Sequence, residues 1–515
     1  MIAFTLAQLA AFAPCEVLAG NAVKLSVEQV TITHVSTSSQ EIGENCLFIP
    51  LKGERFDAHK FITDALSRGA VACATHLSEE EILALLSPEE QERYHQWREQ
   101  AYLLKCTDTL RLLGRCGELV RHKSPALIGA ITGSCGKTSA KEMTAAILSH
   151  CGSTLYTAGN FNNDVGVPLT LLRLDEKQPF AIIEQGASHL QDIARTAEFV
   201  AADYALITNV GEAHILGFGS REGVYKGKSE ILDHLFTLHP VDKIEQSPTA
   251  ALKREVGFGI VPADSPWWPR WQEDYAAAVQ QGKLLSFGES EQATMQVSHI
   301  VEQGEMLSFH LHCHDERFPL DGDFCLQMLG RHNALNAAGA ALLSLVMGAN
   351  AEAVQQGLNS SQLISGRLTP EHYGQLTVID DAYNASFNAV LAAVDTLSKQ
   401  QGVRILVLGD MGELGDAEIE LHEKVGAYAV GKIDWLVCIG PLSQYCVEAM
   451  GQKACHFLKH EDLLAVLEAH VSECLDAGKE VCCLVKGSHA MHMEKVVSAL
   501  QELGKKRLAG EAESK

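Results

Sequence analysis

The sequence predicts an α/β protein of three domains. These are a small α/β N-terminal domain over residues 1–125, a central domain with a mainly parallel sheet over 126–365, and a C-terminal, doubly wound domain over 366–515. The chain has 515 residues, whereas a domain usually contains roughly 100–200. Apolar residues make up 46% of it, enough to fill several cores. Strand-like runs alternate with helical patterns beyond residue 126, as in parallel sheets with crossover helices.

The N-terminal segment carries short alternating runs such as Val30–Val35, followed by a polar helical stretch, Ser78–Gln100. Its first residues, Met1–Ala13, are apolar and end near Cys15, which is the pattern of a signal peptide or a lipoprotein cleavage site. This stretch lacks a basic start, and Pro14 stands just before the cysteine. We therefore expect a first amphipathic helix there.

The central segment begins with a buried strand and ends with a β-hairpin. The expected strands are Leu127–Thr132, Ala181–Glu184 and Tyr204–Thr208, and the hairpin is formed by Thr294–Ile300 and Glu305–Cys313. The tract Leu238–Gly282 contains prolines, two adjacent tryptophans and weak periodicity. We interpret it as a loop or an irregular excursion.

The C-terminal segment alternates strands and helices regularly. The expected strands are Leu376–Asp380, Arg404–Leu408, Trp435–Ile439 and Val481–Val485. The expected helices are Ala385–Ser398, Glu418–Ala429 and Asp462–His470. Such alternation predicts a parallel, Rossmann-like sheet with helices packed on it.

Composition excludes several classes of function. The formal net charge is −24, which argues against nucleic-acid partners and anionic membranes, because both call for a basic surface. No stretch is long and apolar enough for membrane insertion. The 15 cysteines show no regular spacing, and free thiols are typical of a reducing cytosol, so we expect a cytoplasmic protein with small-molecule substrates.

One short segment suggests a metal site of its own. His310, His312, Cys313 and His314 lie close together, and we expect the three histidines on one face of a strand. Polar residues at every second position of a strand usually mark a solvated face. We favour that interpretation over metal binding.

A glycine-rich turn follows the first strand of the central segment. It reads Gly133-Ser134-Cys135-Gly136-Lys137-Thr138-Ser139 and leads into an expected helix, Thr138–His150. Glycine lets the backbone present N–H groups to phosphates, and a helix N-terminus adds a positive dipole end. Lys137 would reach the β- and γ-phosphates of a nucleotide, and Thr138 would hold Mg²⁺. Ile131 replaces the first glycine of the strict motif, yet the strand before and the helix after favour a P-loop-type ATPase domain.

Three more residues follow in the order that a magnesium–ATP site needs. Glu184 ends one expected strand, His214 follows another, and Lys228 comes soon after, beside Glu230. Taken singly, each is best explained as a loop or surface residue. Together with the glycine-rich turn, they favour metal-assisted phosphoryl transfer, because Mg²⁺ prefers hard oxygen ligands at the ends of neighbouring strands.

These motifs resemble those of the Mur ligase family over the whole chain. The glycine-rich turn resembles the phosphate loop of that family. The other matching segments are Leu51–His59, Gly159–Thr170, Leu206–His214, Lys228–Glu230, Gly330–Asn336, Gly366–Arg367, Asp380–Asn384, Leu408–Gly415 and Lys486–Ser488. The segments Gly159–Thr170 and Leu206–His214 are most similar to the family member that adds D-alanyl-D-alanine.

The resemblance implies an ATP-dependent, ADP-forming ligase with a role in peptidoglycan synthesis, cell shape and division. Its substrates would be UDP-N-acetylmuramoyl-tripeptide and D-alanyl-D-alanine, joined through an acyl phosphate. Its cofactors would be ATP and Mg²⁺. The resemblance assigns the metal to Thr138, Glu184 and His214, with a carbamylated Lys228 as the bridging ligand.

The resemblance also assigns nucleotide contacts in two separate domains. Asn333 and Asn336 would contact adenine, while Arg367 and Asp381 would contact phosphate and ribose. ATP would then lie between the central and C-terminal domains, whose closure would exclude water from the acyl phosphate.

Two other functions remain open. The uridine-binding motif of the family, Asp-Ser/Thr-Arg, is Ser38-Ser39-Gln40 here, which keeps open a Mur-like amide ligase of another pathway. A non-catalytic ATP-binding module is the second alternative. The set Lys137, Glu184, His214 and Lys228 argues against it, because a scaffold needs no metal-binding and charge-neutralising residues.

Overall fold

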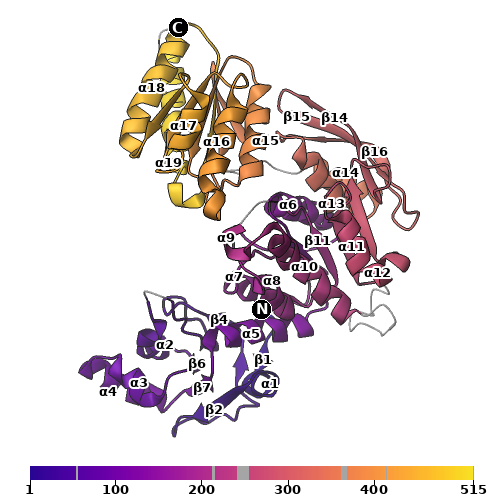
Figure 1. Ribbon diagram of the computed structural model, residues 1–515. Helices are drawn as coiled ribbons and strands as arrows, with labels where there is room; N and C mark the ends of the chain where they lie inside the picture. Colours follow the sequence, from indigo (N-terminus) through magenta and orange to yellow (C-terminus); the bar gives the residue numbers. More distant parts are fainter. Residues whose placement is uncertain (54–55, 212–214, 240–254, 361–367, 413, 514–515) are drawn as a thin grey trace.

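Three α/β units lie along an arc in the computed structural model (Figure 1). The structure describes residues 1–515 except 54–55, 212–214, 240–254, 361–367, 413 and 514–515. Each unit contains one large sheet, made of five, nine and six strands. The predicted fold class, mixed α/β with mainly parallel sheets, is confirmed. The domain limits at residues 125 and 365 stay a prediction.

The N-terminal unit is a five-stranded sheet with helices. Across the sheet the strands are β2 (Cys15–Ala19), β7 (Tyr102–Cys106), β6 (Ala72–Thr75), β5 (Cys46–Phe48) and β4 (His34–Ser36). Only β2 runs antiparallel to its neighbour among these pairs. The helices are α1 (Leu6–Phe12), α2 (Ile62–Ser67), α3 (Glu79–Ala84), α4 (Pro88–Arg98) and α5 (Thr109–Lys123). Two short strands, β1 (Phe4–Thr5) and β3 (Thr31–Ile32), pair beside them.

The helices expected in the N-terminal unit are present, with one additional break. The helix expected in Met1–Ala13 is present as α1, with a capping box formed by Thr5 and Gln8. The polar helical stretch expected over Ser78–Gln100 is present as two helices, α3 and α4. Ser87 caps the second helix and proline occupies its first position, so a new helix begins there.

The central unit has a nine-stranded sheet. Its order is β16 (Asp321–Leu326), β15 (Met306–Cys313), β14 (Met295–Gln303), β13 (Leu284–Gly288), β12 (Phe258–Pro262), β11 (Tyr204–Ile207), β8 (Leu127–Thr132), β10 (Phe180–Glu184) and β9 (Thr154–Tyr156). Pairs from β9 to β14 are parallel, while β14, β15 and β16 are antiparallel. The expected hairpin is therefore confirmed as β14–β15.

The tract Leu238–Gly282 was interpreted as a loop, and its described part corrects this. It contains β12 and two helices, α11 (Trp268–Asp274) and α12 (Ala276–Gln280). The Trp271 ring is fully buried and its Nε1 donates to Ser229 Oγ at 2.9 Å. The adjacent tryptophans, Trp267 and Trp268, are partly buried against the same hydrophobic cluster as Trp271, so they contribute to packing.

Helices cover both faces of the central sheet. One hydrophobic cluster joins it to α6 (Lys137–Ser149), α13 (His332–Val346) and α14 (Ala351–Asn359). The other joins it to α5, α7 (Gly166–Leu171), α8 (Asp192–Val200) and α10 (Arg221–Leu238), and continues into the N-terminal sheet. The helix α5 therefore connects the first two units through a shared core.

The C-terminal unit is the doubly wound sheet that the sequence predicted. Its order is β17 (Thr369–Tyr373), β18 (Leu376–Asp381), β22 (Val481–Lys486), β19 (Val403–Gly409), β20 (Trp435–Ile439) and β21 (Ala454–Phe457). All pairs are parallel except β17–β18. One face packs on α15 (Phe387–Ser398), α16 (Glu418–Ala429) and α17 (Gln444–Met450), and the other on α18 (His460–Asp476) and α19 (Glu494–Glu513).

Among the helices of the described chain, none is long and apolar enough to cross a membrane.

Candidate active site

The glycine-rich turn links the carboxyl end of β8 to the start of α6. Gly136 is the N-cap of α6 and has a positive φ of 76°, which favours glycine. Gly133 also has a positive φ, and a Cβ there would overlap Thr208 Oγ1. The turn can therefore bend tightly only because both positions lack a side chain. In open parallel sheets, ligands bind at the carboxyl edge of the strands. The binding site lies where the connections that follow two neighbouring strands run in opposite directions.

The loop after β11 holds the turn in shape. Cys135 N donates to Asn209 Oδ1 at 2.9 Å, and Asn209 Nδ2 donates to Cys135 O at 2.9 Å. Ser134 N donates to Asn209 O at 3.0 Å, and Gly211 N donates to Ser134 Oγ at 2.9 Å. Asn209 was not among the predicted site residues. Its position directly after a strand next to the turn is the signal that would have identified it.

Lys137 curls back over the turn. Its Nζ donates to Gly133 O at 2.8 Å, so the ammonium group lies over the loop that would cradle phosphates. Ser139, also predicted, is buried in the first turn of α6. Lys137 is thus well located to neutralise phosphate charge.

The structure brings Glu184 and Thr138 together. Glu184 ends β10, is 2% exposed, and its Oε2 accepts a hydrogen bond from Thr138 Oγ1 at 3.0 Å. Its other oxygen, Oε1, accepts from Asn162 Nδ2 at 2.8 Å. A carboxylate and a hydroxyl in contact beside a phosphate-type turn are the hard oxygen donors that Mg²⁺ prefers. These two predicted metal ligands therefore fit a magnesium ion, and Asn162 is an additional residue of the same site.

Lys228 is fully buried on α10. Its Nζ donates to Ala187 O at 3.0 Å and lies 5.2 Å from the centre of the Phe218 ring. Burial, followed by the nearby charge of Lys137, lowers the pKa of Lys228 well below its usual value. The folded protein therefore favours a neutral amine at this position.

Glu230 has a structural role. Its carboxylate accepts hydrogen bonds from Gln191 N at 2.6 Å and Ala194 N at 2.9 Å, at the start of α8. This satisfies N–H groups that have no partner within the helix. Both oxygens of the Glu230 carboxylate therefore have backbone partners at the start of α8.

Two predicted site residues, His214 and Arg367, lie outside the described residues. Elsewhere in the described chain, no group of three or more His, Cys, Asp or Glu side chains is arranged to hold a metal ion. His214, one of the metal ligands expected from the sequence, is not among the residues to which this result applies.

Asn333 and Asn336 lie in the first turns of α13, next to the glycine-rich turn. Asn336 Nδ2 donates to Asn333 Oδ1 at 3.1 Å, and Asn333 Nδ2 donates to Leu329 O at 2.7 Å. Asn336 also limits the space at Gly136, because a Cβ there would overlap Asn336 Oδ1. Both amides therefore lie at the edge of the phosphate-type turn, where a nucleotide would extend.

The C-terminal unit approaches the same edge. Cys135 Sγ lies 3.2 Å from Ser386 Oγ, just before α15. Asp381 ends β18 and forms a buried ion pair with Lys486, whose Nζ lies 2.6 Å from Asp381 Oδ2. Lys486 also donates to Asn384 O at 2.9 Å. Lys486, which was not predicted as a site residue, thus fixes the loop that carries Asp381 and Asn384.

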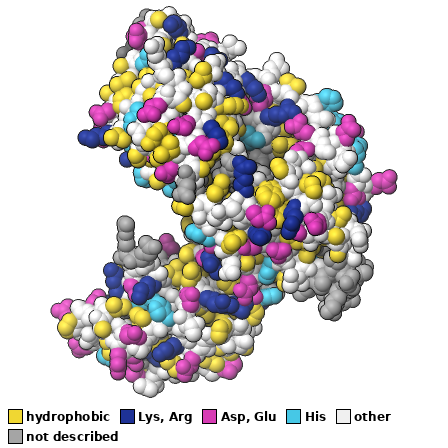
Figure 2. All heavy atoms as spheres, in the orientation of Figure 1, with side chains coloured by type: hydrophobic (Ala, Val, Ile, Leu, Met, Phe, Trp, Pro, Cys, Tyr) yellow, Lys and Arg dark blue, Asp and Glu magenta, His cyan; other side chains and the backbone are white. Residues whose placement is uncertain are grey.

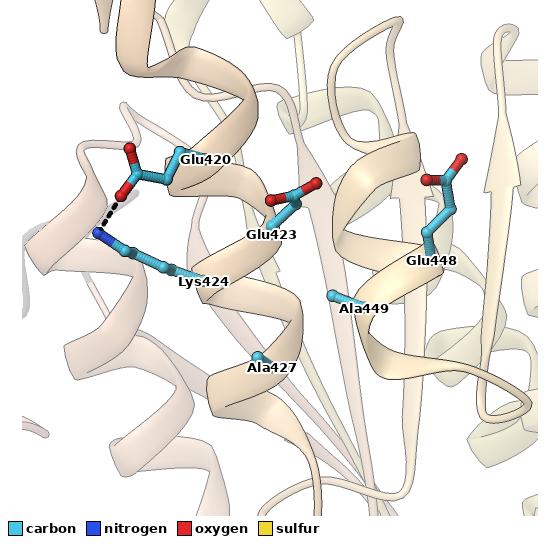
Figure 3. A pocket seen from close by; sticks show the side chains of 6 residues that line it. All are labelled: Glu420, Glu423, Lys424, Ala427, Glu448 and Ala449. Atoms are coloured by element: carbon cyan, nitrogen blue, oxygen red, sulfur yellow. Dashed lines mark ion pairs between the residues drawn. The ribbon is translucent and has the colours of Figure 1, made fainter.

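Figure 2 shows the molecule hollowed on one side, between the N-terminal unit and the C-terminal unit. A different, shallow hollow lies on the surface of α16 and α17 (Figure 3). It is lined by Glu420, Glu423, Lys424, Ala427, Glu448 and Ala449, and Glu420 and Lys424 form an ion pair across one turn of α16. Its charged residues are surface side chains on helices, and none of them is among the site residues predicted from the sequence.

The histidine-rich strand forms a polar surface with the neighbouring strand. His310 Nδ1 lies 2.8 Å from Asp323 Oδ1, and His312 Nδ1 lies 2.8 Å from Asp321 Oδ1. The hydrogen bond to Asp323 raises the pKa of His310. Cys313 is buried on the other face, and His314 lies beyond the end of β15, so the expectation of three histidines on one strand face was wrong for His314.

Comparison with known families gives two matches. Residues 131–344 match the Mur ligase middle domain, and residues 366–489 match the family described as Mur ligase, glutamate ligase domain. The UDP-N-acetylmuramoyl-tripeptide–D-alanyl-D-alanine ligase of Escherichia coli K12 is 37% identical over 512 residues, covering 98% of this chain and all of the relative. The Haemophilus influenzae protein of the same name is 33% identical and covers 92% of this chain and 95% of its own.

Solved structures agree in fold. A crystal structure of MurF from Acinetobacter baumannii superposes with a TM-score of 0.82 at 29% identity, covering 97% of this chain and 99% of its own. MurF ligase from Thermotoga maritima, solved in complex with ADP, has a TM-score of 0.74 at 23% identity and covers 92% of this chain and 98% of its own.

Proposed function

The chain belongs to the Mur ligase family, and from this premise we propose that it joins D-alanyl-D-alanine to UDP-N-acetylmuramoyl-tripeptide. The reaction forms an amide bond and converts ATP to ADP and phosphate. The Escherichia coli and Haemophilus influenzae relatives, both named as ligases for these two substrates, align with 98% and 92% of the chain. The protein is thus a ligase of peptidoglycan precursor synthesis, and through it contributes to cell shape and division.

The observation that carries the proposal is the contact between Thr138 and Glu184 beside the glycine-rich turn. A buried carboxylate and a hydroxyl at 3.0 Å, next to Lys137, form a site for a metal-bound triphosphate. The donor set of Thr138, Glu184, His214 and a carbamylated Lys228 would hold Mg²⁺. When bound, this ion acts as a Lewis acid that neutralises charge on the phosphates.

The first chemical step is phosphoryl transfer. The terminal carboxylate of the tripeptide attacks the γ-phosphorus of ATP, the bond to the β,γ-bridging oxygen breaks, and ADP leaves with the electron pair. The product is an acyl phosphate. Lys137 neutralises the charge that develops on the transferred group, and the backbone N–H groups of the turn orient it.

The second step forms the amide. The neutral amine of D-alanyl-D-alanine attacks the acyl carbon, and the tetrahedral intermediate expels inorganic phosphate while the amine loses a proton. Asn333 and Asn336 would contact adenine, and Arg367 and Asp381 would contact phosphate and ribose. Nucleotide contacts from two units would close the site and keep water away from the acyl phosphate.

Carbamylation of Lys228 has a physical basis in its burial. Only a neutral amine adds to CO₂, and the product is a carbamate plus a proton. The lowered pKa of Lys228 favours the reactive amine at neutral pH. The adduct would turn this amine into an oxygen donor of the kind that Mg²⁺ prefers.

We propose a cytoplasmic location because all fifteen cysteines are free thiols, which are stable in a reducing compartment.

The deciding experiment is a phosphate-release assay in which acceptors are crossed with amines. The acceptors are UDP-muramoyl-tripeptides with lysine or diaminopimelate as third residue, and the amines include D-alanyl-D-alanine and its L,L isomer. We expect turnover and a product of the predicted mass only with a tripeptide acceptor and the D,D dipeptide. Lys137→Ala serves as the inactive control.

A Mur-like ligase of another pathway is the second candidate, because Ser38-Ser39-Gln40 replaces the usual uridine motif. In the structure Ser38 Oγ accepts from Gln40 N at 3.3 Å, so the hydroxyl serves the local turn. Losing a charge-assisted hydrogen bond costs roughly 1.5–3 kcal/mol when nothing replaces it. Calorimetry with the UDP-tripeptide and with the UDP-free glycopeptide separates the candidates, since equal affinity for both would favour the other pathway.

A further inference from the structure

A fully buried lysine on α6 has no part in the chemistry proposed so far. Lys141 is 0% exposed and lies one helical turn beyond Thr138. A buried ammonium group is costly unless hydrogen bonds and charges compensate it. Its retention in the core therefore calls for a specific partner.

Lys141 finds that partner in the strand next to Glu184. Its Nζ donates to Thr157 O at 2.6 Å and lies 2.9 Å from Glu142 Oε1. The ammonium also lies 5.6 Å from the centre of the Tyr156 ring. The shortest of these contacts is made to a backbone carbonyl just after β9.

Thr157 connects this contact to the carboxylate. Its Oγ1 accepts a hydrogen bond from Glu184 N at 2.9 Å, and its own N donates to Ile182 O at 3.1 Å. Thr157 is fully buried. Lys141 therefore holds the backbone carbonyl of Thr157, and the hydroxyl of Thr157 holds the backbone N–H of Glu184.

We propose that Lys141 is a positioning residue for the metal site, acting through Thr157 on Glu184. A single helix, α6, then supplies both the hydroxyl of Thr138 and the support that holds the carboxylate against it. The inference rests on the proposed function, because Glu184 is a metal ligand only in that proposal. Groups that orient metal ligands typically contribute 10–100-fold in metal affinity.

The chain offers a matched control for a purely structural role. Lys283 Nζ donates to Val256 O at 2.6 Å and lies 2.7 Å from Glu255 Oε1, the same pattern of one carbonyl and one neighbouring carboxylate. Its side chain is 15% exposed. Both partners of Lys283 come just before β12, whereas Thr138 and Glu184 belong to α6 and β10, so Lys283→Met removes a comparable pair of bonds away from the proposed metal site.

The test measures metal binding directly, using Mn²⁺ as a paramagnetic probe. The full-length variants Lys141→Met, Lys141→Arg, Thr157→Val, Lys283→Met and Glu184→Gln are titrated with Mn²⁺ beside the wild type, with a non-hydrolysable ATP analogue at no more than the protein concentration. Free Mn²⁺ is followed by electron paramagnetic resonance, and melting temperatures are recorded in parallel. The Mg²⁺ concentration for half-maximal activity provides a second readout.

We expect Lys141→Met and Thr157→Val to weaken Mn²⁺ binding by about 10-fold or more. Lys141→Arg should recover most of the affinity, and Lys283→Met should bind as the wild type does. If Lys141→Met fails to fold, Thr157→Val carries the test, because it keeps the size of the side chain and removes only the acceptor for Glu184 N.

Mn²⁺ affinity within twofold of the wild type in the folded Lys141→Met or Thr157→Val variant overturns the proposal. An equal loss in Lys283→Met overturns it as well, since the effect would then be general destabilisation. Unchanged affinity in Glu184→Gln would instead show that the proposed metal site is wrong. The two failures are therefore distinguishable.

Discussion

At the scale of single residues, the environment of Lys228 decides its chemistry. Burial and Lys137 lower its pKa well below the usual value. In the range between that lowered pKa and about 10.4, the unfolded chain binds the proton and the folded chain does not. The free enzyme without the adduct should therefore gain stability as pH rises through this range, and a more alkaline medium should also favour the carbamate.

We predict that activity depends on dissolved CO₂ through Lys228. Degassed, bicarbonate-free buffer should lower the rate, and Lys228→Ala should lose at least about 100-fold, since removal of a residue at the metal typically costs several kcal/mol of barrier. A small carboxylic acid should restore part of the rate. Incorporation of ¹³CO₂ followed by NMR reports the carbamate itself. A fully active Lys228→Ala enzyme would contradict the assignment, and Lys226→Ala, an exposed neighbour, is the matched control.

His422 gives a second pH prediction of the same sign, in a more acidic range. It is buried, its Nε2 accepts from Met411 N at 3.1 Å, and its Nδ1 lies 2.6 Å from Glu418 O, so the ring is neutral. Burial lowers its pKa below 6.5. Below about pH 6.5 the unfolded chain takes up the proton first, so the stability contributed by His422 falls with pH. The melting temperatures of wild type and His422→Gln should therefore differ at pH 7.5 and converge toward pH 5; a constant gap would contradict this.

At the scale of elements, the glycine-rich turn depends on two constraints at Gly136. Its φ of 76° disfavours a side chain, and a Cβ would overlap Asn336 Oδ1. Gly431 has the same φ of 76° but open space around it. A comparison of alanine substitutions at Gly136 and Gly431 therefore separates the effect of backbone strain from the effect of a steric clash with Asn336.

We predict that Gly136→Ala loses nucleotide binding by more than tenfold, while Gly431→Ala loses only stability. The backbone strain alone costs roughly 1–2 kcal/mol in each variant. The collision with Asn336 should in addition displace the turn. Calorimetric titration with ADP and thermal melting measure the two effects separately. Equal ADP affinity in the two variants would show that the turn tolerates the displacement.

The periodic elements were predictable from sequence, and the exceptions have physical reasons. The strands β18, β19, β20 and β22 are rich in apolar residues because helices bury the sheet on both faces. The edge strand β21 is only half-buried, so it lacks that signal. The break between α3 and α4 could have been seen at Ser87-Pro88, where a capping residue precedes a proline.

The candidate site was predictable only where one segment carries the chemistry. Lys137 and Thr138 follow from the turn itself, and Glu184 from the end of its strand. Asn162, Asn209 and Lys141 act through contacts with segments 22, 74 and 16 residues away in the chain. Such pairings depend on the order of strands in the sheet, which single-segment patterns do not contain.

At the scale of the whole molecule, the central and C-terminal units meet in more than one place. Ser386, before α15, lies against the glycine-rich turn. Lys399, after the other end of α15, pairs with Glu302 on β14, and His372 on β17 pairs with Glu305. Figure 1 shows the β14–β15 hairpin reaching toward α15. The hairpin therefore contacts one end of a helix whose other end lies at the glycine-rich turn.

We predict that the Glu302–Lys399 pair helps to keep the C-terminal unit closed over the central unit. Lys399→Glu places like charges at this contact and should open the molecule, which small-angle X-ray scattering would record as a larger radius of gyration. The Lys399 side chain is 54% exposed and that of Glu302 is 14% exposed. Exposed ion pairs are worth about 0.2–1 kcal/mol, so with one partner in solvent the apparent affinity for ATP should fall only a few-fold. Low salt should enlarge the effect, because exposed charges are screened at high ionic strength.

The charge reversal supplies its own control. Glu302→Lys combined with Lys399→Glu should restore both the radius of gyration and the affinity for ATP, because the pair is rebuilt with opposite polarity. Lys424→Glu replaces an equally exposed lysine and breaks its pair with Glu420 inside the C-terminal unit, and should change neither quantity. If the double variant stays open, or if Lys424→Glu opens the molecule equally, the contact is incidental. Closure would then depend on the nucleotide alone, through the turn at Cys135 and Ser386.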